Sequence, residues 1–437
     1  MSHPLAAVVT GPVLRPGDDG FADEVAPHNR AIENRPDVVV GATSAQDVVA
    51  AVRWATEQGV PLTVLATGHG ATTPVTSGVL LTTHRLRGVT IDPVTRVATI
   101  GAGSVWTDVV PAADASGLTP VAGSSTNVGV TGYLLGGGIG PFARSHGYSS
   151  DRVESFTVVT GAGEVVEASA DEHPDLFWAL RGGRSGLGIV TQVRLRLVAM
   201  PELYAGALFF DAEHIETVLR GWLAWTATAD PGTTTSAAII HFPDLEALPP
   251  FLRRRTALSL RVARPGDEAT GAAVTAPLRA LAPTFLDTVG VLPVARAAEI
   301  HADPVDPAPS WVRSVMLDHA DDGLATAWLG VVGPAVDHPF VAVELRHISG
   351  ATETDVPGGS AVAGRGAHFI AGLVGADPSR FAAMPAFADT VADALAPWTA
   401  TELNPNFAGR GTAVWPPETA ERLTRVRRTY DPAAVLG

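Results

Sequence analysis

Three consecutive residues, Gly68-His69-Gly70, place one imidazole between two residues that have no side chain. They follow the run VPLTVLA (60–66), which predicts a buried strand. Glycine-rich turns after strands bring backbone N–H groups close to an anion such as a pyrophosphate, but clustered glycines are also common in tight turns. For His69 the ordinary alternative is a loop histidine bonded to backbone. The spacing alone leaves these interpretations open.

A second glycine-rich stretch, GSSTNVGVTGYLLGGGIGPFARSHG, spans 123–147. The Gly-His-Gly loop lacks the G-x-G-x-x-G pattern, and no acidic residue follows it at the ribose-binding distance. A Rossmann site and a nicotinamide cofactor are therefore not expected. The chain has no cysteine, and its 13 histidines form no HxH or HExxH pair. We expect no metal site for that reason.

Composition removes further classes of function. The chain has no lysine, which excludes Schiff-base catalysis, and no cysteine, which excludes disulfides and thiolate chemistry. A formal net charge of −15 argues against a nucleic-acid partner. The sequence contains no run of about twenty apolar residues, so no membrane span is predicted. The N-terminal residues lack a basic leader and a long apolar stretch, so we expect no secretory signal and a cytoplasmic location.

The elements that would position the glycine loops can be placed from their patterns. A helix is predicted over 44–59, with Ser44 as its cap and Gly59 at its end. The strand over 60–66 and the histidine loop come next. Further predictions are hairpins over 88–103 and 154–169, helices over 104–117 and 171–183, and a strand over 186–200.

From about residue 201 the glycine clusters end. Strand-like runs over 206–210, 257–262 and 340–348 alternate with helices, of which 211–228 and 268–282 are two. This alternation of strand-like and helical segments predicts a second domain of α+β type. A chain of 437 residues is too long for one ordinary core, so we expect two domains, with one of them split in sequence.

The motifs together resemble a known family. They run in the order VLATGHGATTP, GAG with Trp106 and Asp108-Val109, VGVTGYLLGGGIG, HGYSSDRVESFTVVTGAGEVVEAS, then DEHPDLFWALRGG with GLGIVT. This order resembles the berberine-bridge-enzyme-like branch of the FAD-linked vanillyl-alcohol-oxidase (PCMH) superfamily. The resemblance is close over about residues 35–200. It is weaker over the last forty residues, where the closing YDPAAVLG also resembles the end of the family's sequences.

The resemblance implies an α+β fold. A PCMH-type FAD-binding domain of two α+β subdomains would span 1–200 and a substrate domain, with an antiparallel sheet backed by helices, would span 201–395. Residues 396–437 would return to the FAD-binding domain. The cofactor would be FAD, covalently attached to His69 through the flavin 8α-methyl group. The other positions that match cofactor-contacting residues are Thr67, Gly68, Gly70, Ala71, Ser125, Val128, Gly129, Gly132, Tyr133, Gly137, Ile189 and Asn406.

Two departures from the family pattern bear on the chemistry. Many relatives attach the flavin a second time, through a cysteine where this chain has Ser125, so only one bond is expected here. Relatives also often carry a Tyr-x-Asn motif near the C-terminus, which supplies a base. The corresponding stretch here is Asn404-Pro405-Asn406, which lacks the tyrosine.

Another catalytic base is therefore needed, and Glu344 is our candidate. In the predicted strand FVAVELRHI (340–348), Glu344 and Arg346 share one face, which in the family roofs the flavin. Partial desolvation there would raise the carboxyl pKa towards neutrality. The alternative is an ordinary exposed ion pair. Tyr133, Tyr148 and His146 are the remaining candidates.

The expected activity is that of an oxidase acting on an alcohol or activated C–H group of a small secondary metabolite, with molecular oxygen as electron acceptor. Val130 and Thr131 could form a small oxygen pocket, or simply pack in the core.

A second, shorter resemblance points to a different reaction. The stretch VAVELRHISGAT (341–352) resembles the Favorskiiase-type flavoenzymes of polyketide maturation. It would imply an oxygenating reaction on a poly-β-carbonyl chain, with a carrier-protein-bound substrate as an option. A dehydrogenase with another acceptor and a non-catalytic flavin carrier are further alternatives. A monomer or homodimer is expected.

Overall fold

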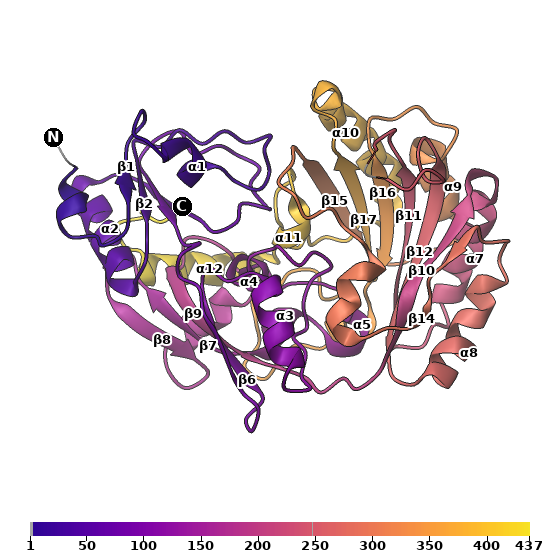
Figure 1. Ribbon diagram of the computed structural model, residues 1–437, viewed down its shortest axis with the longest axis horizontal. Helices are drawn as coiled ribbons and strands as arrows, with labels where there is room; N and C mark the ends of the chain where they lie inside the picture. The colour runs from indigo at the N-terminus through magenta and orange to yellow at the C-terminus, as the bar shows by residue number, and fades with distance from the viewer. Residues whose placement is uncertain (1–2, 247) are drawn as a thin grey trace.

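The computed structural model describes residues 3–246 and 248–437 and has two lobes (Figure 1). The first lobe, on the left in Figure 1, holds both ends of the chain and the strands β1–β9. The second holds β10–β17 and the helices α7–α10. Within the described ranges no helix is long and apolar enough to cross a membrane. The expected cytoplasmic location stays a prediction.

The first lobe contains a four-stranded sheet. Its order is β1 (Val13–Leu14), β2 (Val38–Gly41), β4 (Val79–Thr82) and β3 (Leu62–Leu65), with β2, β4 and β3 parallel. Helix α1 (Phe21–Val25) precedes β2, and α2 (Ala45–Gln58) joins β2 to β3. The Ser44 hydroxyl accepts a hydrogen bond from the Asp47 N–H at the start of α2, and Gly59 ends the helix in a left-handed conformation. The helix and the strand predicted on either side of Gly59 are thus confirmed.

The first lobe also contains a five-stranded antiparallel sheet. Its order is β5 (Val89–Asp92), β6 (Val97–Gly101), β9 (Ile189–Arg196), β7 (Val153–Val159) and β8 (Val165–Ser169). Both predicted hairpins are therefore present, as β5–β6 and β7–β8. The helices of this region are α3 (Trp106–Asp114), α4 (Val130–Leu135), α5 (Ala143–His146) and α6 (Pro174–Leu180).

The second lobe is one large antiparallel sheet backed by helices. Its order is β13 (Leu286–Asp287), β10 (Leu203–Asp211), β12 (Thr256–Pro265), β11 (Thr234–His241), β16 (Ala342–His347), β17 (Phe369–Gly375) and β15 (Trp311–Leu317), and β14 (Gly290–Val291) also pairs with β10. The helices α7 (Ile215–Thr226), α8 (Glu268–Arg279), α9 (Asp322–Val332) and α10 (Met384–Leu395) cover its outer face (Figure 1). The α+β fold class is confirmed.

Strand β16 shows how the large sheet is oriented. Val343 and Leu345 are fully buried in the core that the sheet shares with α7, α9 and α10. Because side chains alternate along a strand, Glu344 and Arg346 face the opposite way, towards the first lobe. The predicted division of this strand into an apolar face and a polar face is confirmed.

The end of the chain returns to the first lobe. After α11 (Pro405–Ala408), helix α12 (Pro417–Tyr430) packs against α6. The last residues then pair with the edge strand β3, where the Leu62 N–H donates to the Val435 carbonyl at 2.7 Å and the Gly437 N–H donates to the Leu62 carbonyl at 3.0 Å. The chain end therefore supports the strand that leads into the His69 loop. The proposed domain boundaries stay a prediction.

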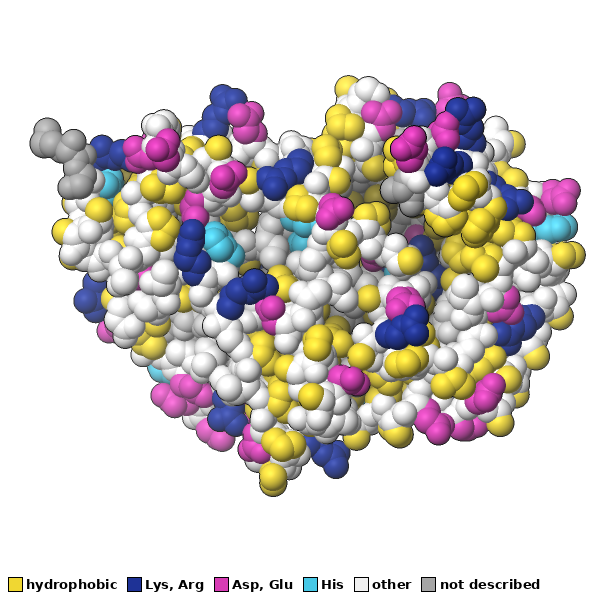
Figure 2. All heavy atoms as spheres, viewed as in Figure 1, with side chains coloured by type: hydrophobic (Ala, Val, Ile, Leu, Met, Phe, Trp, Pro, Cys, Tyr) yellow, Lys and Arg dark blue, Asp and Glu magenta, His cyan; other side chains and the backbone are white. Residues whose placement is uncertain are grey.

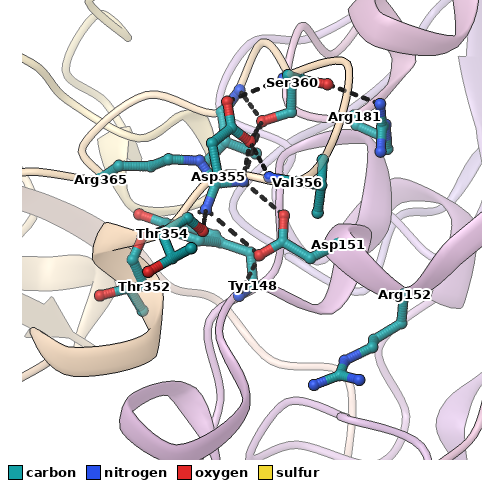
Figure 3. A network of polar contacts seen from close by, with 12 residues as sticks. Tyr148, Asp151, Arg152, Arg181, Thr352, Thr354, Asp355, Val356, Ser360 and Arg365 are labelled. Atoms are coloured by element: carbon teal, nitrogen blue, oxygen red, sulfur yellow. Dashed lines mark hydrogen bonds and ion pairs between the residues drawn. The ribbon is translucent and has the colours of Figure 1, made fainter.

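A buried polar network joins the two lobes (Figure 3). Arg365, from the loop between β16 and β17, pairs with Asp151 of the first lobe at 2.5 Å and with Asp355 at 2.9 Å. Its guanidinium also lies 4.9 Å from the centre of the Tyr148 ring. Arg181 donates to the Gly359 carbonyl at 2.6 Å. Arg365 thus links the loop between β16 and β17 to Asp151 of the first lobe through a largely buried ion pair.

Candidate functional site

The loop after β3 requires glycine at residue 68. Gly68 has φ +73°, in the left-handed region that favours glycine, and an added Cβ would lie 2.4 Å from Cβ of Pro27. The Gly68 carbonyl accepts the Ala71 N–H at 3.2 Å, which closes the turn that carries His69. The turn therefore holds His69 in one place through backbone geometry.

His69 lies in a small polar cluster. Its Nε2 is 3.0 Å from Oδ1 of Asn127, and its Nδ1 is 3.0 Å from the hydroxyl of Thr67. The ring stacks on His28, with ring centres 3.5 Å apart and planes 15° apart. Burial, with a smaller effect of His28, lowers the pKa of His69 to about 4. The imidazole is therefore neutral at pH 7.

The tautomer of His69 follows from its partners. The Asn127 amide nitrogen donates to the Val305 carbonyl, which can only accept, so Oδ1 of Asn127 points towards His69. An amide oxygen cannot donate, so Nε2 of His69 carries the proton. Nδ1 then keeps its lone pair and accepts from the Thr67 hydroxyl. The nucleophilic nitrogen of His69 is therefore Nδ1.

Backbone donors surround this imidazole. Among the described residues, the N–H groups of Gly68, His69 and Gly70, and those of 124–128, donate to no carbonyl or side chain. Successive free N–H groups form a concave site for an anion. The two predicted glycine-rich stretches meet here, because Gly129 lies beside Thr67, with its Cβ position 3.5 Å from the Thr67 hydroxyl. A diphosphate fits this arrangement.

Helix α4 continues from the second stretch. A Cβ at Gly132 would meet no atom within 4 Å, so space is open beside this turn of the helix. Val130 is fully buried in the core, which supports its packing role, whereas the buried hydroxyl of Thr131 has no hydrogen-bond partner in the described part of the chain. The oxygen pocket stays a prediction. Asn406 supports the helix from α11 by donating to the Tyr133 carbonyl at 2.8 Å.

The remaining predicted cofactor residues lie at varied distances from His69. Ser125 donates to Oδ1 of Asn127 at 2.8 Å and belongs to the cluster, and the Ala71 carbonyl accepts from Asn29. The Val128 carbonyl accepts the Trp106 N–H. Gly137 (φ +102°) lies against the Tyr148 ring instead, and the Ile189 side chain is in the core of the four-stranded sheet. Their cofactor contacts stay predictions.

Figure 2 shows the surface hollowed between the lobes, where histidine and basic side chains gather. A cleft on the inner face of the large sheet lies between that sheet and the α4–α5 connection. Its walls are Gly140, Pro141, Thr234, Thr235, Ser236, Arg261, Val262, Ala263, Ile300, His301 and Arg346.

Glu344 lies behind two arginines of this cleft. Its carboxylate pairs with Arg261 at 2.8 Å and with Arg346 at 3.0 Å. Burial would raise the pKa of Glu344, but the guanidinium groups of Arg346 and Arg261 outweigh it and hold the pKa below its usual range. The expected raised pKa was therefore wrong. The reason is that Arg261, on β12, reaches the same face, which the sequence of β16 alone did not show.

The other candidate bases are also poorly placed. The Tyr148 ring is fully buried, and burial raises the pKa of Tyr148 and of Tyr133 above the usual range. Burial, with Arg152, lowers the pKa of His146 to about 4, and its Nδ1 meets the Ser145 hydroxyl. None of these three is among the residues that line the cleft. A catalytic role for each stays a prediction.

Sequence reasoning missed the partners of these residues. His28 and Asn127 were not singled out, although Asn127 stands within the glycine-rich stretch. Arg261 and His301 were also missed. A usable signal existed for Arg261, because a charged residue interrupts the apolar strand β12. His301 had no such signal.

Residues 36–169 match the FAD-binding domain family model. The chain is 33% identical over 231 residues to an FAD-dependent monooxygenase of Penicillium roqueforti and 35% identical over 207 residues to (R)-6-hydroxynicotine oxidase of Paenarthrobacter nicotinovorans. These alignments cover 52% and 46% of this chain and 45% of each relative, so the match spans about half the length of either protein.

Solved structures agree along the whole chain. The fold matches 6-hydroxy-D-nicotine oxidase from Arthrobacter nicotinovorans with a TM-score of 0.82 at 24% identity, covering 100% of this chain and 98% of that one. The chain carries an FAD-binding domain and has the fold of the berberine-bridge-enzyme-like oxidases. A glucooligosaccharide oxidase from Acremonium strictum, described with 6-S-cysteinyl, 8α-N1-histidyl FAD, matches with a TM-score of 0.81 at 19% identity, covering 99% and 97%. The comparisons thus show a match to the FAD-binding domain over residues 36–169 and this fold along the chain, and a place in the Favorskiiase-type branch stays a prediction.

Proposed function

We propose that this protein is an FAD-dependent oxidase whose FAD is covalently attached to His69 by a single bond. The substrate would be a small molecule with an alcohol or activated C–H group. The observation that carries the proposal is the neutral imidazole of His69, held with Nδ1 unprotonated beside a run of free backbone N–H groups.

The residues of the site fit FAD. The N–H groups of 68–70 and 124–128 would bind the diphosphate, and the open space beside Gly132 leaves room along α4. When bound, FAD would accept two electrons from the substrate and pass them to oxygen. The protein's part is to orient His69 through Asn127 and Thr67. Ser125 stands where a second attachment would need a cysteine, so one bond is expected.

The comparisons support the coarser part of this proposal. One relative and one solved structure carry names that state the same activity, oxidation of 6-hydroxynicotine, and the Acremonium oxidase is described with a histidyl FAD. The lower identity of the solved structures limits their support to the fold. The oxidised substrate, the use of oxygen and the bond to His69 are the parts that need testing.

Covalent attachment is tested by acid denaturation and gel electrophoresis. In the wild type, flavin fluorescence should stay with the polypeptide, and in His69→Ala it should be lost from the band. His214→Ala, which removes a histidine from the second lobe, is the matched control and should keep the fluorescence. Release of intact flavin from the wild type would disprove the attachment.

The oxidase reaction is tested by turnover. Substrates are first screened by anaerobic bleaching of the flavin absorbance. The net reaction of an alcohol with oxygen would give a carbonyl compound and hydrogen peroxide in equal amounts, so oxygen uptake and peroxide release should match. Turnover only with an artificial acceptor would indicate a dehydrogenase. Absence of bleaching by every substrate class would favour a non-catalytic flavin carrier, and bleaching by NADH or NADPH would count against the oxidase.

A second candidate is an oxygenating reaction, which the monooxygenase relative favours. It predicts incorporation of labelled oxygen from ¹⁸O₂ into the product, with less peroxide than oxygen consumed. The oxidase predicts unlabelled product in the same experiment.

A further inference from the structure

The cleft on the large sheet has an unusual set of polar groups. Arg261 from β12 and Arg346 from β16 both point towards the first lobe, and their side chains are only 11% and 12% exposed. His301, at the end of the turn 294–300, lines the same cleft and its side chain is 7% exposed. Side chains of this type are rarely so buried unless they are paired or bind a ligand.

The hydrogen bonds within this group leave donors unused. Each arginine reaches Glu344 through one terminal nitrogen, at 2.8 Å and 3.0 Å. In the described part of the chain, Nε of Arg261, Nε of Arg346 and both ring nitrogens of His301 have no hydrogen-bond partner. A cluster that served folding alone would leave buried donors unsatisfied, which costs stability.

The charges within contact distance do not balance. Two guanidinium groups share the single carboxylate of Glu344, and no other carboxylate in the described ranges lies within 4.0 Å of either arginine. Burial, with Arg261 and Arg346, lowers the pKa of His301, so this imidazole is neutral. Asp303 also acts on Arg346, but it is farther away and accepts a hydrogen bond from Ser124 at 2.8 Å. One buried positive charge therefore lacks a contacting counter-ion.

The cleft also adjoins the proposed flavin site. Ser124, whose hydroxyl donates to Asp303, carries the first of the free N–H groups of the second glycine-rich stretch. The Arg346 guanidinium lies 5.6 Å from the ring centre of Phe407 in α11, the helix whose Asn406 supports α4. A ligand held by the two arginines would thus lie between the large sheet and the loops of the first lobe.

We propose that the substrate carries a carboxylate, which Arg261 and Arg346 bind in this cleft while His301 contributes a neutral hydrogen-bonding group. That the bound carboxylate belongs to the substrate rests on the proposed oxidase function. Guanidinium groups suit a carboxylate because their planar forks match its two oxygens. Glu344 remains the fixed anion that sets the spacing of the two arginines. The space in front of the two guanidinium groups, about 240 Å³, includes open solvent, so the cleft opens to the outside of the protein.

The experiment compares benzoate with benzamide, which has nearly the same shape and no charge. Binding to the oxidised holoprotein is measured by calorimetry, so no turnover is needed. Benzoate should bind about tenfold or more tightly than benzamide, since a charge-assisted pair replaces a neutral one. Equal affinities would overturn the proposal, and this comparison requires no variant.

Variants then locate the site. Arg261→Gln and Arg346→Gln should each weaken benzoate binding by about tenfold or more and leave benzamide binding unchanged. Arg264→Gln, on the same strand but paired with Asp230 at 3.1 Å, is the matched control and should bind benzoate as the wild type does. If the glutamine variants fail to fold, Arg261→Lys and Arg346→Lys replace them, and they should still weaken benzoate binding because lysine lacks the planar fork. Unchanged benzoate affinity in the arginine variants would overturn the proposal.

The two proposals fail in different ways. If no substrate reduces the flavin but benzoate is still preferred and the arginine variants lose it, the oxidase assignment fails and the carboxylate site stands. If the flavin is reduced by neutral substrates and benzoate shows no preference, the oxidase stands and the carboxylate site is wrong.

Discussion

At the scale of single residues, the chemistry of His69 depends on partners that are remote in sequence. Asn127 lies 58 residues away and makes the hydrogen bond that keeps the proton on Nε2. Val305, from the second lobe, fixes the orientation of that amide. The nitrogen available for a covalent bond is therefore decided by three segments that meet only in the folded protein.

Asn127→Leu removes this control. The apoprotein mixed with FAD should form the covalent product roughly tenfold more slowly, because a hydrogen bond that fixes the reactive tautomer is lost. The measurement is the fraction of flavin that stays with acid-precipitated protein over time. Ser125→Ala is the control, since it removes only the second donor to Oδ1 of Asn127 and should react at nearly the wild-type rate. Attachment at the wild-type rate in Asn127→Leu would show that tautomer control is unimportant.

Glu344 has a different role from the one its strand position indicated. Glu344→Gln leaves two buried guanidinium groups without their shared anion, so the free energy of unfolding should fall by about 3 kcal/mol. Urea unfolding of the holoprotein measures this. If stability is unchanged while substrate-driven flavin reduction falls about a hundredfold, Glu344 would be the catalytic base after all.

At the scale of elements, the β3 loop shows how backbone geometry presents a side chain. Strand β3 is paired on one side by β4 and supported on the other by the chain end, so its direction is fixed. The left-handed Gly68 then turns the chain against Pro27. His69 comes directly after this turn, and the free N–H groups belong to the three consecutive residues 68–70. A short loop is therefore enough to place the imidazole beside the backbone donors.

Gly68→Ala and Gly70→Ala form a matched pair within this loop. In Gly68→Ala the left-handed φ costs about 1–2 kcal/mol and Pro27 must also move, so FAD binding should fall strongly. Gly70→Ala meets only the flexible end of Arg184 at 3.2 Å and should retain most of its FAD. Flavin content per mole of purified protein is the measurement. Equal flavin content in the two variants would show that the loop tolerates a different backbone conformation.

At the scale of the whole molecule, the two lobes meet through buried polar groups as well as through packing. Arg365 pairs across the interface with Asp151 (Figure 3), and Arg144 of α5 inserts into the second lobe to donate to the Thr233 carbonyl at 2.8 Å. The cleft with Arg261 and Arg346 lies along the same interface. Its shape therefore depends on the relative position of the lobes.

Acid should destabilise the molecule before its carboxylates are protonated. Burial lowers the pKa of His146 and His338 to about 4, below the ordinary value of 6.5. The unfolded chain therefore binds protons from about pH 6.5 downwards while the folded protein does not, so stability falls as the pH drops from 6.5 to 4. The thermal midpoint should be several degrees lower at pH 4.5 than at pH 7.5. A constant midpoint over this range would mean that these imidazoles are protonated in the folded state.

The sequence determined the local elements. Helix α2 with its Ser44 cap, the hairpins β5–β6 and β7–β8, and the alternating faces of β16 were all predicted, because each depends on residues within one short segment. The glycine loops alone left the anion site open, and FAD was expected only because the order of the motifs resembled an FAD-linked family.

Only the tertiary structure decided the electrostatics of the site. The tautomer of His69 required Asn127 and Val305, and the lowered pKa of Glu344 required Arg261 from another strand. A pKa reflects every charge and every buried surface near a group, whichever part of the chain supplies them. The face on which Glu344 lies could be predicted from alternation along one strand, but the arginine that shares that face could not.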